Sequence, residues 1–310
     1  MGALGAVLAP FAEMAASPLF LAEVLIGGVA AGLLYALVAL GFVLIFKASG
    51  VFNFAQGVMV LFAALTLVGL MDRGVPALLA LALTIAVMIL LAFAIERVVL
   101  RPLVNQAPII LFMATIGLTF FLEGFGEMVW GANVKRLDVG IPDTSFKVAG
   151  LLVNRLELAA ALTAAVLVTV LAIFFQKTRI GRALRAVADD HEAALSIGIP
   201  LKTIWVVVWS VSGLVALAAG IMWGAKSGVQ FSLSLIALKA LPVLILGGFT
   251  SVPGAIVGGI MIGIGEKVAE VYWGPLVGGA IENWFAYVIA LGFLLVRPQG
   301  LFGERIIERV

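Results

Sequence analysis

The feature that most constrains this chain is a series of long apolar runs, each separated from the next by charged residues or by Pro and Gly. A membrane span needs roughly 20 mainly apolar residues to cross about 30 Å of hydrocarbon. The runs near that length cover residues 20–46, 51–71, 75–95, 108–130, 157–176, 203–224, 233–250, 254–271 and 279–296. With 64% hydrophobic and only 12% charged residues, the composition does not suit a water-soluble surface. We therefore predict an all-α polytopic membrane protein.

The basic residues favour one orientation of these runs. If every run crosses fully and the N-terminus is external, 11 Lys and Arg residues lie inside and 7 outside. Loops rich in Lys and Arg favour the cytoplasm, so we prefer this orientation. It places the two densest basic clusters, residues 177–202 and 297–309, on the cytoplasmic side. The N-terminus is accordingly expected on the periplasmic side.

Residues 49–57 concentrate small and polar groups between two apolar stretches. Irregular backbone at membrane depth is tolerated only where it is buried in protein or lines a watery cavity. We therefore predict about eight transmembrane helices plus a broken or re-entrant segment here. Asn53 and Gln56 lie beside Phe52 and Phe54, so their amides could contact a small polar solute. A hydrogen bond to a neighbouring helix is the other interpretation.

Charged residues inside the runs are also candidates for the solute path. A charge at a helix centre costs roughly 2.5 to 3.5 kcal/mol on insertion scales, so such residues seldom face lipid. Glu123 and Glu127 are four residues apart and share a helix face, where contact with water is the favoured interpretation. Lys239 is deeper in its run. It could neutralise a solute carboxylate or Glu123, or form a structural ion pair. The predicted path residues are Asn53, Gln56, Gly57, Glu123 and Lys239.

Several classes of chemistry are disfavoured. The chain has no Cys and a single His, His191, which argues against thiolate or histidine metal centres. It has no P-loop and no arrangement of nucleophile and base. The net charge of +2 is small and scattered, which argues against nucleic-acid binding. We predict a non-catalytic chain with no metal or cofactor of its own.

The longest polar stretch, residues 177–202, can form a short helix from Arg179 to Ser196, with apolar residues grouped on one face. Gly198 followed by Pro200 is typical of a helix end. This helix could lie at the membrane interface, or it could dock another protein.

Five segments, in order, resemble branched-chain amino-acid-type ABC importer permeases, and the resemblance covers nearly the whole chain after about residue 25. They are GLLYALVALGFVLIF with VFNFAQG, IERVVLRPL, GRALRAVADDHEAALSIGIP, LKALPVLILGGFTSVPGAIVGGIMIGIGE and VRPQGLFG. The resemblance implies one transmembrane permease domain, 1–310, that forms half of a translocation path. Residues 177–202 would be its cytoplasmic coupling loop.

The resemblance also implies partners. These are a second homologous permease, two cytoplasmic ATPases that bind ATP and Mg²⁺, and an extracytoplasmic solute-binding protein, at a bacterial cytoplasmic (inner) membrane. The coupling loop would seat in a cleft of the ATPase. Its expected contact residues are Gly181, Arg182, Leu184, Val187, Ala188, Asp190, Ala193 and Gly198.

The substrate stays open at this point. Gln56 stands where a histidine is common in the family's NFAHG form, and Pro242 interrupts the stretch after Lys239. Branched-chain or other hydrophobic amino acids come first, with urea, short amides or small organic acids, including aromatic ones, as alternatives. A self-sufficient secondary transporter or channel is a further alternative, but it would be expected to bury more ionisable groups near the midplane.

Overall fold

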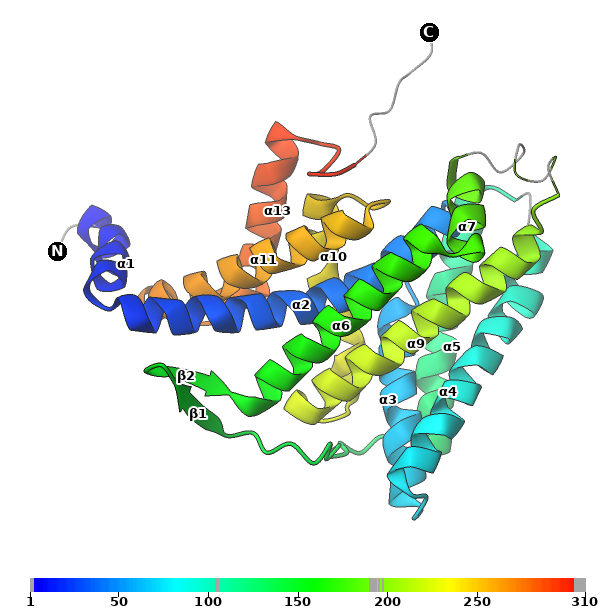
Figure 1. The fold of residues 1–310 in the computed structure, drawn as a ribbon, viewed down its shortest axis with the longest axis horizontal. Coiled ribbons are helices and arrows are strands. Elements are labelled where there is room, and N and C mark those ends of the chain that lie inside the picture. Colours follow the sequence, from blue (N-terminus) through cyan, green and yellow to red (C-terminus); the bar gives the residue numbers. More distant parts are fainter. Residues whose placement is uncertain (1–2, 104–105, 190–193, 195, 197, 304–310) are drawn as a thin grey trace, which may run out of the picture. The chain divides into compact units, whose positions relative to one another are not determined.

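The structure, a computed structural model, describes residues 3–103, 106–189, 194, 196 and 198–303, and helices dominate it (Figure 1). The helices are α1 (Ala3–Ala16), α2 (Pro18–Ser49), α3 (Gln56–Asp72), α4 (Ala77–Ala94), α5 (Pro108–Trp130), α6 (Arg155–Lys177), α7 (Arg179–Asp189), α9 (Leu201–Ser227), α10 (Ile236–Gly247), α11 (Val252–Tyr272), α12 (Gly274–Val277) and α13 (Phe285–Val296). The short π or 3-10 turns are η1 (Ile95–Leu100), η2 (Arg101–Leu103), η3 (Phe231–Leu235) and η4 (Ile281–Asn283).

Each of the nine apolar runs forms a helix in the described chain, which confirms the predicted fold class. Helices α2, α5, α6, α9 and α11, and α4 continued through η1 and η2, are long and apolar enough to cross a membrane. The predicted break is present, because residues 50–55 lie outside any helix and Gly50 has a φ of +68°. The 17-residue α3 that follows rises about 26 Å, and η3 continues into α10 so that Phe231–Gly247 also has 17 residues, whereas the 12-residue α13 rises only about 18 Å. Helix α13 is therefore too short to cross alone.

The chain divides into two compact units. The α3 unit contains residues 37–139 and 166–238, and the α11 unit contains residues 1–36, 140–165 and 239–310. Helices α2, α6 and α10 contribute residues to both units. The expectation of one permease domain over 1–310 therefore stays a prediction.

Helix α3 forms the centre of its unit, and α4, α5, α9 and η3 pack around it (Figure 1). Every residue from Gln56 to Gly69 is buried, as expected for a helix that is apolar on all sides. Small residues permit the close approach: a Cβ placed on Gly220 of α9 would lie 2.6 Å from the Val60 carbonyl oxygen. At one end of α3, the Arg73 guanidinium lies 4.5 Å from the centre of the Trp130 ring of α5.

In the α11 unit, the first half of α2 packs against α11 through glycines. A Cβ placed on Gly32 would lie 2.5 Å from the Gly259 carbonyl oxygen, and a Cβ on Gly259 would lie 2.5 Å from the Gly32 carbonyl oxygen. A Cβ on Gly258 would lie 2.7 Å from the Val243 carbonyl oxygen of α10. Gly258 and Gly259 therefore serve helix packing.

A small hairpin, β1 (Ser145–Val148) and β2 (Leu151–Asn154), precedes α6 and was not predicted from the sequence. The strands are antiparallel, with Ser145 opposite Asn154 and Lys147 opposite Leu152. The connecting residues Ala149 and Gly150 have φ of +52° and +89°, which is the left-handed pair that a two-residue type I′ turn requires.

Candidate functional site

The break between α2 and α3 is fixed by a fully buried Asn53. Its Oδ1 accepts a hydrogen bond of 3.0 Å from the Ala55 N–H, and its Nδ2 lies 3.8 Å from the Met59 Sδ. A side-chain oxygen that accepts the N–H two residues later is a local turn device. Asn53 therefore shapes the entry into α3.

Gln56, at the start of α3, connects three helices and is also fully buried. Ser212 of α9 places its Oγ 2.7 Å from the Gln56 Oε1 and 3.1 Å from the Gly41 carbonyl oxygen of α2. The helix-to-helix hydrogen bond considered from the sequence is thus present. The Gln56 Nε2 is buried without a hydrogen-bond partner among the described residues. An unpaired buried donor costs about 1 to 3 kcal/mol, so this amide is a candidate for binding a solute oxygen.

The neighbours of Gln56 are packing elements. A Cβ on Gly57 would overlap the Ser234 carbonyl oxygen of η3 and lie 2.7 Å from the Ala237 Cβ of α10. Gly57 therefore permits the close approach of η3 and the start of α10 to α3. Phe52 stacks on Phe42 with ring centres 4.8 Å apart. Phe54 meets Phe112 of α5 edge-on at 5.2 Å. The aromatic pair beside Asn53 therefore packs against α2 and α5.

Lys239, in α10, forms an ion-pair cluster. Its Nζ lies 3.8 Å from the Glu266 Oε1 of α11 and 4.0 Å from the Glu282 Oε1 of η4. Glu266 is only 4% exposed, and the Tyr35 hydroxyl hydrogen-bonds with it. Glu270 positions the η4 turn, because its two carboxylate oxygens accept the N–H groups of Ala280 and Glu282.

The sequence analysis did not single out Glu266 or Glu282. Glu266 directly precedes Lys267 in the last third of the apolar run 254–271, so the pair is interpreted as charge near a helix end. The available signal was that Glu266 lies within the Gly-rich stretch and therefore at a close helix contact. Glu123 is half-buried and Glu127 is exposed on α5, and the water-facing interpretation stays a prediction.

Helix α7 confirms the short amphipathic helix predicted from Arg179, within the residues that the structure describes. The Thr178 Oγ1 caps it by accepting the Gly181 N–H at 3.0 Å. The Arg185 Nη1 donates to the Phe175 carbonyl at the end of α6, at 2.6 Å. The side chains at Leu184 and Val187 are buried within the chain, where α7 packs on α9.

The predicted coupling residues therefore fall on different faces of α7. Leu184 and Val187 hold the helix in place, and a Cβ on Gly181 would overlap the Phe175 carbonyl oxygen. Arg182 is exposed and Ala188 is half-buried. Gly198 has a φ of +84°, which fits its predicted place at a turn before α9. Asp190 and Ala193 lie outside the described residues, as does His191.

The helices and the ordered motifs can be compared with known proteins. A family model described as "Branched-chain amino acid transport system / permease component" matches residues 24–297. The chain belongs to this permease family. It is thus a multi-pass membrane subunit of an ABC transport complex, and the resemblance seen in the sequence is confirmed.

Curated relatives of this permease match over almost their full length. The high-affinity branched-chain amino acid transport system permease protein BraD of Pseudomonas aeruginosa is 27% identical over 301 residues, which cover 92% of this chain and 97% of BraD. The corresponding LivH of Escherichia coli is 28% identical, with 94% and 98% covered. A probable LivH of Methanocaldococcus jannaschii is 29% identical, with 87% and 89% covered.

Proposed function

We propose that this chain is the permease subunit of an ABC importer for branched-chain and other hydrophobic amino acids, and that it forms half of the translocation path. The observation that carries the proposal is the family match over residues 24–297, with relatives of the same length named as branched-chain amino acid permeases. The fold agrees, because six helices of the described chain are long and apolar enough to cross a membrane.

The proposed complex contains a second homologous permease, two cytoplasmic ATPases that bind and hydrolyse ATP with Mg²⁺, and an extracytoplasmic solute-binding protein. In the cytoplasmic membrane, residues 177–202 and the C-terminus would face the cytoplasm and the N-terminus the periplasm. The bias of Lys and Arg residues supports this orientation. The exposed Arg182 supports an ATPase contact on the outward face of α7.

For the path, Gln56 is the residue that the geometry favours. Its Nε2 is a buried donor without an acceptor among the described residues, and it suits the carboxylate of an amino acid. Asn53 and Gly57 would support this position by shaping the break and the close helix contact. Lys239 is engaged by Glu266 and Glu282, so it could receive a solute carboxylate only by exchanging partners. Glu123 stays a candidate for the outer part of the path.

The decisive experiment reconstitutes the chain with its partner permease, ATPases and binding protein in proteoliposomes. We expect ATP-dependent uptake of leucine, isoleucine and valine. Uptake of urea, acetamide or benzoate in place of these amino acids would refute the proposed substrate, while the proposal of an ABC importer would stand. Gradient-driven uptake by the chain alone would refute the importer and favour a secondary transporter or channel.

Energy coupling is tested separately by Arg182→Glu. A reversed charge on the exposed face of α7 should reduce co-purification of the ATPase by about tenfold, which corresponds to one lost charge-assisted hydrogen bond. The matched control is Arg136→Glu, an exposed arginine in the predicted external loop, which should leave association unchanged. Equal co-purification with both variants would contradict the proposed role of α7.

A further inference from the structure

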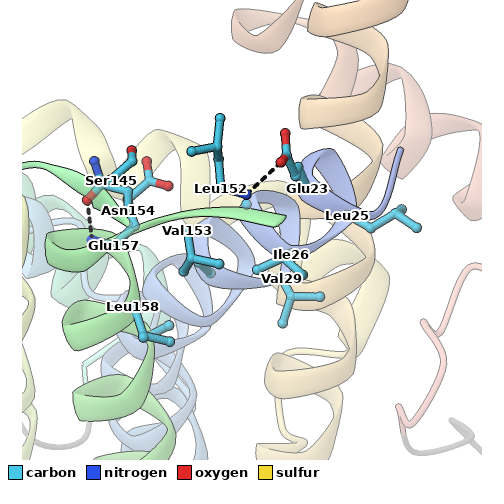
Figure 2. Close-up of a pocket in the computed structure, with 13 residues that line it drawn as sticks. Glu23, Leu25, Ile26, Val29, Ser145, Leu152, Val153, Asn154, Glu157 and Leu158 are labelled. Atoms are coloured by element: carbon cyan, nitrogen blue, oxygen red, sulfur yellow. Dashed lines mark hydrogen bonds between the residues drawn. The ribbon is translucent and has the colours of Figure 1, made fainter. Parts of the chain in front are cut away.

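A groove of about 460 Å³ lies between the first half of α2, the β1–β2 hairpin and the first turns of α6 (Figure 2). All of these elements belong to the α11 unit. The volume lies within the roughly 300 to 1,000 Å³ that is typical of small-molecule sites. Neither the path residues nor α7 contribute to the groove, so it is separate from the proposed function.

The floor of the groove is apolar. Small side chains, Ala30 of α2 and Ala161 of α6, leave the space, and larger ones border it. The bordering residues Leu25, Ile26 and Leu158 are between 36% and 40% exposed. In a membrane-spanning chain, exposed aliphatic side chains on helices of this kind meet lipid hydrocarbon. An acyl chain therefore matches the chemistry of the floor.

The polar groups gather at one end of the groove. The first turns of α2 and α6 both lie at this end. The Glu23 Oε1 accepts the Leu152 N–H at 2.6 Å, which holds this carboxylate at the rim (Figure 2). Glu157 stands in the first turn of α6, and its N–H is accepted by the Asn154 Oδ1 at 3.1 Å. From Glu23 to Ala30 the groove descends about 10 Å along α2, the depth from the headgroup region into hydrocarbon.

A positive charge stands beside the rim, on a residue that does not itself line the groove. Lys147 lies opposite Leu152 in the hairpin, so the two side chains stand on the same face as Asn154. Carboxylates at the rim and a lysine beside it complement a headgroup that has both an ammonium and a phosphate. An ionised carboxylate has about four lone-pair sites, so Glu23 can accept a further N–H while it keeps its bond to Leu152.

From this arrangement we infer that the groove is a phospholipid site. It holds one acyl chain on the floor formed by α2 and α6, and it selects a headgroup with a primary ammonium, as in phosphatidylethanolamine, through Glu23 and Glu157. A choline headgroup has no N–H to donate, and a glycerol headgroup has no positive charge. Both are bound less well.

The test uses the full chain, purified from mixed vesicles that contain equal amounts of phosphatidylethanolamine, phosphatidylcholine and phosphatidylglycerol. Retained lipids are counted by native mass spectrometry. We expect about tenfold enrichment of phosphatidylethanolamine over each of the others, the ratio that one charge-assisted hydrogen bond gives. In Glu23→Gln/Glu157→Gln the enrichment should fall to about one, because the amide oxygen at residue 23 still accepts the Leu152 N–H but the charges are gone.

A second variant separates the floor from the rim. Ala161→Phe fills the groove and should abolish retention of the lipid, whereas the matched control Leu162→Phe, on the outward face of the same helix, should retain it. Unchanged enrichment in the double glutamine variant, or unchanged retention in Ala161→Phe, would overturn the inference. The inference would also be overturned if a photo-reactive residue placed at position 161 formed a cross-link to another protein and none to lipid.

Discussion

Removal of the Lys239 charge is the perturbation whose consequence the structure defines best. In Lys239→Met the aliphatic stem is kept, but Glu266 loses the ammonium 3.8 Å away and stays only 4% exposed. Glu282, whose side chain is 50% exposed, loses a contact of 4.0 Å and can be hydrated by water. The effect of the substitution therefore falls mainly on Glu266.

The expected magnitude follows from the two distances. A pair at 3.8 Å interacts by about 4 kcal/mol at an effective dielectric constant of 20, and an exposed pair such as Lys239 with Glu282 contributes about 0 to 1 kcal/mol. Removing one member of a buried pair costs roughly 3 to 5 kcal/mol, because the other charge is left without compensation. We expect Lys239→Met to lower the free energy of unfolding by about 3 kcal/mol.

The assay is SDS-induced unfolding in mixed micelles, followed by tryptophan fluorescence, on a double-mutant cycle. Glu266→Gln should cost about 1 kcal/mol, because Lys239 keeps Glu282 and the glutamine can still accept the Tyr35 hydroxyl. The double variant should be about as stable as Glu266→Gln alone, with a coupling energy of roughly 2 kcal/mol or more. Additive losses, or a Lys239→Met protein as stable as the parent, would refute the reasoning.

Further predictions concern the helix contacts and the break. Gly32→Ala should destabilise the protein by about 1 to 3 kcal/mol, because its Cβ would lie 2.5 Å from the Gly259 carbonyl oxygen. Gly27→Ala, whose Cβ would meet only the Lys267 Cε of a flexible side chain at 3.6 Å, should stabilise the protein by up to about 1 kcal/mol in the same unfolding assay. Gln56→Leu should change stability by about 1 kcal/mol or less, because Ser212 keeps its carbonyl acceptor, yet it should strongly reduce leucine uptake in proteoliposomes. Full uptake by this variant would remove Gln56 from the path.

Much of the fold could be predicted because its determinants are local. The length and apolar character of residues 20–46 or 203–224 specify a membrane helix without reference to any other segment. The polar residues at 49–57 likewise mark the break, because small and polar side chains do not suit a continuous helix in an apolar surrounding. The face periodicity of residues 179–189 predicts an amphipathic helix on its own.

The candidate site could be predicted only in part. Gln56 and Lys239 became candidates because a polar or charged residue in an apolar run is conspicuous in the sequence. Their partners were not, because Ser212 lies 156 residues from Gln56 and Glu266 lies on a different helix from Lys239. The apolar side of α7 was expected to meet an ATPase, but Leu184 and Val187 pack within the chain.

The sequence by itself determined the fold class, the number of helices among the apolar runs, the break before α3 and the membership of the permease family. The first three depend on hydrophobicity and periodicity, which neighbouring residues define together, whereas the family membership rests on motifs that follow one another in the family's order. The tertiary structure alone decided which face of α7 is outward, which carboxylates neutralise Lys239 and where a groove forms beside the hairpin. Those properties depend on which helices meet, and in a membrane that choice rests on close packing at glycines such as Gly32 and Gly259 rather than on the apolar pattern common to all the helices.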